Sequence, residues 1–153
     1  GCPQKAAVLQ LLAKGILTPQ AQGAFAPDAL LTLSDAATAM LRSLGLPGEG
    51  VPAAAGQGLL PFEGKDGDPV SREGLAAMLV CTYNRRAPDK AIVGGVERYP
   101  DRGKISPWAL DYVRAADEMK FMGPADDEGN FLPQAPVTRA QAAGYLYKMM
   151  ATR

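Results

Sequence analysis

Apolar residues recur at helical spacing in three similar segments of the chain, and each segment begins with a hydroxyl side chain. Thr32, Ser71 and Thr138 align with one another, and apolar residues stand four, five, eight and twelve positions after each of them. Those offsets lie on one face of an α-helix. The pattern therefore predicts three copies of one amphipathic helix.

Each of these helices is predicted to begin at its hydroxyl residue. A Ser or Thr N-cap accepts a hydrogen bond from a first-turn N–H that has no partner within the helix. Three residues after the cap, Gln141 gives the third copy a capping box, Asp35 offers the first copy an acidic version, and Gly74 breaks the box in the second. An apolar residue precedes each cap, as a hydrophobic staple requires: Leu31, Val70 and Val137.

A second helical stretch lies upstream of each cap and is joined to it by turn-forming residues. These stretches are Lys5 to Lys14, Val51 to Gln57, and a helix that Ser106 caps and that continues to Met119. We therefore predict an all-α fold, with residues 1–153 forming a single domain of three helix–loop–helix repeats. The repeats span residues 1–47, 48–90 and 91–153. Because one such unit cannot bury its own apolar face, stability should require all three.

Composition and charge exclude several classes of function. The chain has 153 residues, 16 basic and 16 acidic side chains, and no histidine. A net charge of zero argues against a nucleic-acid partner. The lack of histidine removes Ser-His-Asp and Cys-His centres and the usual zinc sites. No carboxylate pair stands out for glycan cleavage. We predict a non-catalytic protein with no metal and no cofactor.

The two cysteines, Cys2 and Cys81, leave several interpretations open. Cys81 lies in an apolar helical stretch, where a small core residue is expected. Cys2 could form a disulfide with Cys81, or it could be the lipidated residue of a lipoprotein. No apolar run approaches the roughly 20 residues that a membrane-spanning helix needs.

Motifs in the third copy resemble the repeats of a known family. Phe131-Leu132-Pro133, followed by Val137-Thr138-Arg139-Ala140-Gln141, is similar to the F-x-P…(V/I)-T-R-A-E signature of S-layer homology (SLH) repeats. Tyr99-Pro100-Asp101 with Ile105-Ser106-Pro107-Trp108-Ala109 is similar to the opening of such a repeat, and Gly15-Ile16 with Phe25-Ala26-Pro27 is similar to its middle. The other copies depart from the pattern. Leu33 replaces the signature arginine in the first, and the second lacks F-x-P and the opening Asp and Trp. In the third copy, Lys120 replaces the usual helix-ending glycine.

The resemblance implies a triple SLH module that closes into a pseudo-threefold prism around a central three-helix bundle. It also implies a monomeric anchor on the extracellular surface of a bacterium. Its partner would be secondary cell-wall polysaccharide, often pyruvylated, bound in grooves between repeats, or peptidoglycan. The alternative is a protein-interaction or structural module that has kept the fold and lost wall binding.

Arg139 and Arg72 occupy the place of the family's signature arginine, which helps to hold the anionic sugar. Each is expected in the first turn of a helix, where a cation opposes the helix dipole at a cost of about 0.3–1 kcal/mol. Such a cation implies either an anionic ligand or an acidic neighbour. The alternative to ligand contact is therefore a salt bridge to Glu73, Asp101 or another carboxylate.

Three further residues are candidates for sugar contact. Trp108 could offer a stacking platform, or it could pack in the core or between repeats. Asp101 could bind a sugar hydroxyl, or it could cap the turn before Ser106. Asp117 is a weaker candidate for hydroxyl contact.

Overall fold

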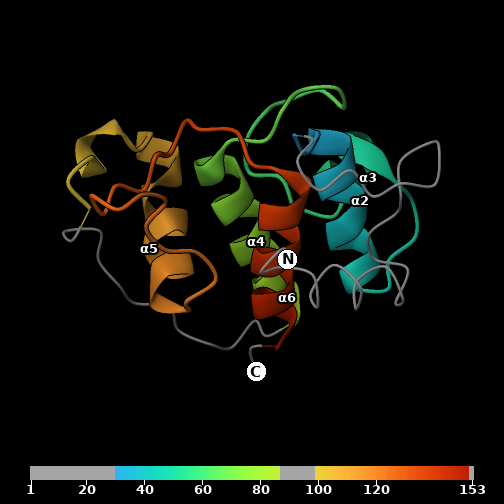
Figure 1. The fold of residues 1–153 in the computed structure, drawn as a ribbon. Helices are drawn as coiled ribbons and strands as arrows, with labels where there is room; N and C mark the ends of the chain where they lie inside the picture. Colours follow the sequence, from blue (N-terminus) through green and yellow to red (C-terminus); the bar gives the residue numbers. More distant parts are fainter. Residues whose placement is uncertain (1–29, 87–98, 152–153) are drawn as a thin grey trace.

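The computed structural model describes residues 30–86 and 99–151, and the regular elements in these ranges are helices (Figure 1). The predicted all-α class is thus confirmed. The predicted helix Lys5 to Lys14 and the interpretations of Cys2 lie outside the described residues. The elements are α2 (Leu33–Ser43), α3 (Gly50–Gly56), α4 (Arg72–Arg86), α5 (Leu110–Glu118) and α6 (Arg139–Ala151), with 3-10 turns η1 (Arg102–Lys104) and η2 (Pro107–Ala109).

The three predicted hydroxyl caps are all present. Thr32, Ser71 and Thr138 accept hydrogen bonds from the N–H groups three residues later, at 3.1–3.2 Å. In the third copy, Gln141 Oε1 also accepts from the Thr138 N–H at 3.0 Å, which completes the predicted capping box. In the first copy, one Asp35 carboxylate oxygen instead pairs with Arg139, far along the chain. Ser106 precedes η2 without a side-chain cap bond, so this helix begins as a 3-10 turn.

Helix α4 lies at the centre of the molecule and contacts α2, α5 and α6 (Figure 1). Its residues from Arg72 to Val80 are all buried, because neighbours cover it on several sides. Helix α3 packs on α2, and α5 packs on α4. The first helix of each of these copies therefore packs on the second helix of the preceding copy, so the copies interlock.

A closed ring of backbone hydrogen bonds joins the three segments that precede the caps. The Leu31 N–H donates to Val137 O at 2.8 Å, the Val137 N–H donates to Val70 O at 3.1 Å, and the Val70 N–H donates to Leu31 O at 3.1 Å. Each staple residue thus donates to one copy and accepts from the other. The ring relates the three caps by a pseudo-threefold arrangement, while the complete prism stays a prediction.

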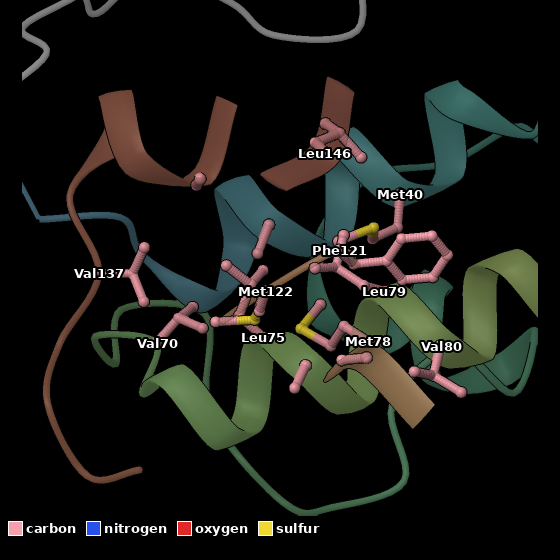
Figure 2. Close-up of a cluster of buried hydrophobic side chains, with 14 of the residues drawn as sticks. Met40, Val70, Leu75, Met78, Leu79, Val80, Phe121, Met122, Val137 and Leu146 are labelled. Carbon is pink, nitrogen blue, oxygen red and sulfur yellow. The ribbon is translucent and has the colours of Figure 1, made fainter. Parts of the chain in front are cut away.

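The apolar faces of these helices meet in one core. Figure 2 shows Met40 of α2, Leu75 and Leu79 of α4, and Leu146 of α6 pointing toward one another. Phe121 and Met122, which follow α5, complete the cluster. The core therefore takes side chains from all three copies, as expected for units that cannot fold alone.

The first helices of the second and third copies end in the same way, although with different residues. After α3, Gly58 has φ +77°, and the Leu59 N–H donates to Ala54 O. After α5, Lys120 has φ +64°, and the Phe121 N–H donates to Ala116 O at 2.9 Å. Both are left-handed C-terminal caps. Lys120 therefore adopts a left-handed conformation that usually favours glycine.

Candidate functional site between the second and third copies

Arg72 lies in the first turn of α4, where the second copy meets the third; we call this contact junction 2/3. Its side chain is buried, and its three nitrogens donate to Phe131 O at 2.7 Å, Tyr145 Oη at 2.6 Å and Gly123 O at 2.7 Å. The guanidinium also lies over the Phe131 and Tyr145 rings, 4.9 and 5.4 Å from their centroids. All these partners are neutral. Within residues 30–86 and 99–151, no carboxylate forms an ion pair with Arg72.

The loop that receives Arg72 is held by Asp101. One oxygen of the buried Asp101 carboxylate accepts from the Phe131 N–H, and the other accepts from the Leu132 N–H, both at 2.9 Å. Asp101 thus fixes the start of the segment Phe131 to Pro133, which we call the FLP loop. Its contact with a sugar hydroxyl stays a prediction.

A small cavity opens beside the FLP loop. It has a volume of about 200 Å³ and lies next to Leu132, whose φ of +55° is strained for a residue with a branched side chain. Among residues 30–86 and 99–151, Leu132 is also one of the few large apolar side chains exposed to solvent. The cavity combines amide, charged and apolar groups: Asp101, Lys104, Asn130, Leu132, Pro133, Gln134 and Ala135.

Glu73 lies beside Arg72 in sequence but does not pair with it. Its buried carboxylate accepts from the Ser106 N–H at 3.0 Å and from Gln134 Nε2 at 3.2 Å. Arg72 and Glu73 therefore do not form the salt bridge that was predicted from the sequence as an alternative. Glu73 instead ties the start of α4 to the start of η2 and to Gln134, the residue that follows the FLP loop.

Trp108 packs between copies and also remains accessible. Its ring lies 5.2 Å from that of Phe62, at an interplanar angle of 33°, and 42% of the residue is exposed. Phe62 belongs to the segment before the second cap. It fits there because Gly74 has no side chain, since a Cβ at Gly74 would lie 3.3 Å from Phe62 Cζ. The structure thus confirms packing between copies and leaves a surface on which a sugar could stack.

Asp117 is linked to the FLP loop through Tyr99. Its Oδ1 accepts from the Tyr99 hydroxyl at 2.7 Å. Tyr99 is buried and packs edge-to-face on Phe131, with the centroids 5.3 Å apart. The contact of Asp117 with Tyr99 thus supports the FLP loop through the Phe131 ring, and a sugar-binding role for Asp117 stays a prediction.

Arg139 lies at a different place, where the third copy meets the first; we call this contact junction 3/1. Its Nη1 pairs with Asp35 Oδ2 at 2.7 Å. The Arg139 side chain is 3% exposed, whereas that of Asp35 is 37% exposed. The alternative of a salt bridge to another carboxylate is therefore what the structure shows for Arg139.

Arg72 and Asp101 both bind Phe131, Arg72 at its carbonyl and Asp101 at its N–H. Trp108 follows two residues after Ser106, whose N–H donates to Glu73, the neighbour of Arg72 in sequence. Arg139 lies apart from them, at junction 3/1. Sequence reasoning missed Tyr145, whose hydroxyl binds Arg72 and whose position on α6 gave no sign of a long-range partner. It also missed Lys104 and Gln134 at the cavity. Gln134 directly follows the F-L-P motif, which was the one available signal.

Comparison with known families finds one match, which lies in the third copy. Residues 98–143 match the model of the S-layer homology domain. The match covers 46 of the 153 residues, so the third copy is similar to an S-layer homology domain. The matched range holds the FLP loop, Asp101, Trp108, Asp117 and Arg139, and Arg72 lies outside it. No curated protein matches the chain in sequence.

S-layer homology domains are non-catalytic modules that bind cell-wall polymers, and proteins that carry them are associated with the cell surface. Among residues 30–86 and 99–151, no helix is long and apolar enough to cross a membrane. The match therefore agrees with the predicted attachment to the cell wall.

Proposed function

We propose that this chain holds a protein on the bacterial cell wall by binding an anionic secondary cell-wall polysaccharide at junction 2/3. The observation that carries the proposal is the Arg72 guanidinium, a buried cation whose described partners are all neutral. A guanidinium has five N–H donors, and the three contacts leave two for a further acceptor. A carboxylate is the acceptor that such a fork binds best. Because Arg72 is 4% exposed, the acid group must reach the edge of the guanidinium from the surface.

The surroundings of the FLP loop supply groups that suit a sugar. Asn130 and Gln134 offer amides for hydroxyls, and Lys104 offers a second cation. Leu132 and Pro133 provide an apolar wall, and the exposed part of Trp108 can stack on the C–H face of a ring. These groups support a saccharide that carries an acid, such as a pyruvate ketal.

The same proposal extends to the whole chain, as one domain of three repeats over residues 1–47, 48–90 and 91–153. The ring of hydrogen bonds among Leu31, Val70 and Val137 supports it, since each bond joins two different copies. The domain would act as a monomer and perform no catalysis.

A sedimentation assay with purified bacterial wall sacculi tests the proposal. The protein should pellet with intact sacculi and should stay in solution when the secondary polymer has been removed chemically. Arg72→Gln should lose most of the pelleting. Arg114→Gln is the matched control, because Arg114 forms a surface pair with Asp111 at 3.5 Å. Equal pelleting with stripped sacculi would contradict polysaccharide anchoring.

A second candidate function is a structural or protein-interaction module that has lost wall binding. The pairing of Arg139 with Asp35 favours it, since this signature arginine is already neutralised. Leu33 in place of the arginine in the first copy points the same way. A folded protein that fails to pellet with intact sacculi would support this candidate.

A further inference from the structure

The two signature arginines differ in the charge that faces them. Arg139 Nη1 lies 2.7 Å from a carboxylate oxygen of Asp35. Arg72 donates to two backbone carbonyls and one phenol, and has no carboxylate partner among the described residues. Both side chains are almost fully buried, so their exposure does not distinguish them. They differ in the partners that the neighbouring copy provides, a carboxylate for Arg139 and neutral groups for Arg72.

The sequence explains this difference through the third position after each cap. The ring of backbone bonds places each copy beside the next, and Asp35 of the first copy reaches Arg139 of the third. For Arg72 of the second copy, the corresponding residue is Gln141 of the third. Gln141 is neutral, and its Oε1 is occupied by the Thr138 N–H in the capping box. The position that provides a carboxylate for Arg139 is therefore occupied by a neutral amide at the corresponding place for Arg72.

We propose that Asp35 is an internal counter-anion that closes junction 3/1 to the acid group of a wall polysaccharide and so restricts anion binding to junction 2/3. This inference rests on the proposed function, and it names Asp35 as a residue that sets where the polymer binds. The Asp35 carboxylate has the same chemistry as the acid of a pyruvylated sugar. It is held beside Arg139 by the fold, so a free ligand must displace it. The Asp35 side chain is 37% exposed and that of Arg139 is 3% exposed, so solvent reaches the carboxylate more readily than the guanidinium.

Calorimetric titration of the whole chain with a methyl hexoside that carries a pyruvate ketal tests this inference. The same hexoside without the ketal is the ligand control. Asp35→Ala should double the number of sites that wild type shows, because the acid can then reach Arg139. The added site should disappear in the double variant with Arg139→Gln. Asp111→Ala is the matched control, since the Asp111 side chain is 90% exposed and its removal should leave the number of sites unchanged.

A second variant protects the test against a failure to fold. Asp35→Asn removes the charge and keeps an oxygen that can accept from Arg139, so this variant should fold. Its junction 3/1 should bind the pyruvylated hexoside at least tenfold more tightly than junction 3/1 of wild type does. If both Asp35 variants keep the wild-type number of sites, the inference is overturned and the proposed function stands. If wild type binds nothing and Asp35→Ala gains a site that needs Arg139, the inference stands and the assignment to Arg72 falls. Absence of binding in every variant overturns both.

Discussion

Junction 2/3 and the contact between the first and second copies, junction 1/2, share one backbone pattern and differ in their side chains. At junction 1/2 the Leu33 N–H donates to Asp68 O and the Ser34 N–H donates to Asp66 O, at 2.7 and 3.0 Å. At junction 2/3 the corresponding N–H groups, of Arg72 and Glu73, donate to Ala135 O and Pro133 O at 2.9 and 3.0 Å.

The side chains at corresponding positions have changed as a pair. Arg72 lies over the ring of Phe131, whereas Leu33 lies against Gly64, which stands seven residues before its cap as Phe131 does. A large ring and a long cation fill one junction, and a branched apolar side chain against a bare backbone fills the other. The backbone bonds therefore maintain the arrangement of copies, while this pair decides whether a junction holds a charge.

The largest expected effect comes from making junction 2/3 resemble junction 1/2. Arg72→Leu leaves Phe131 O, Gly123 O and the Tyr145 hydroxyl without their donor, and a shorter side chain leaves space over the Phe131 ring. Buried acceptors that lose a partner cost about 1–3 kcal/mol each and are not additive, so we expect a loss of roughly 3 kcal/mol in the free energy of unfolding. Urea denaturation followed by circular dichroism measures it.

Arg72→Lys is the control for this prediction. It keeps the charge but cannot reproduce the three-sided contact, so its loss should be smaller than that of Arg72→Leu. A loss below about 1 kcal/mol for Arg72→Leu would mean that the guanidinium contributes little to joining the copies.

The next largest effect concerns one aspartate in each copy that accepts from backbone N–H groups, Asp66 in the second and Asp101 in the third. Asp101 holds the FLP loop with two N–H groups in a buried setting, whereas the exposed Asp66 accepts from the Val51 N–H at 2.7 Å in the second copy. Asp101→Ala should therefore lower the free energy of unfolding by about 2 kcal/mol, and Asp66→Ala by about 1 kcal/mol or less. Thermal and urea unfolding of the two variants compare them directly. Equal losses would show that burial of the carboxylate does not decide how much each aspartate contributes to the free energy of unfolding.

The comparison also shows what sequence could and could not predict. The helices and their caps depend on spacings of three to twelve residues, so periodicity and Thr32, Ser71 and Thr138 were enough to predict them. The position of Arg72 between copies was implied by the resemblance to SLH repeats. The partners of the charged side chains were not, because Asp35 lies 104 residues from Arg139, and Tyr145 lies 73 residues from Arg72.

Asp35 illustrates the physical reason. Local spacing assigned it to a capping box, and its N–H does bind Thr32. Its carboxylate binds Arg139 instead, because closure of the ring brings a buried cation within 2.7 Å. A charge-assisted contact with a buried guanidinium outweighs a local bond to an N–H near the surface. Local patterns predict elements, and the long-range arrangement then reassigns their polar groups.

A third prediction tests the pairing of Leu33 with Gly64. A Cβ at Gly64 would overlap Leu33 Cδ2, and Leu33 is buried, so it has little room to move. Gly64→Ala should cost about 1–2 kcal/mol of unfolding free energy. In the double variant with Leu33→Ala the overlap is relieved, and the two losses should be less than additive in a double-mutant cycle. Gly67→Ala is the control, because no atom lies within 4 Å of its Cβ position. Strict additivity would place the two residues out of contact.

The smallest expected effect concerns the ends of the first helices, where the two junctions have exchanged their family features. Helix α3, at junction 1/2, ends at Gly58 with φ +77°, and α5, at junction 2/3, ends at Lys120 with φ +64°. Junction 1/2 thus has the glycine without the arginine, whereas junction 2/3 has the arginine without the glycine. Since the left-handed conformation strains a residue with a Cβ, Lys120→Gly should raise the free energy of unfolding by about 0.5–1 kcal/mol.

The converse change at the other junction provides the matched control. Gly58→Lys should lower the free energy of unfolding by a similar amount, although a Cβ at Gly58 meets no atom within 4 Å, because the backbone conformation alone is strained. Both helices end with the same backbone bond, so a gain in one variant and a loss in the other would isolate that strain. If Lys120→Gly were destabilising, the lysine side chain would have to stabilise junction 2/3 by a contact stronger than the strain of its own backbone.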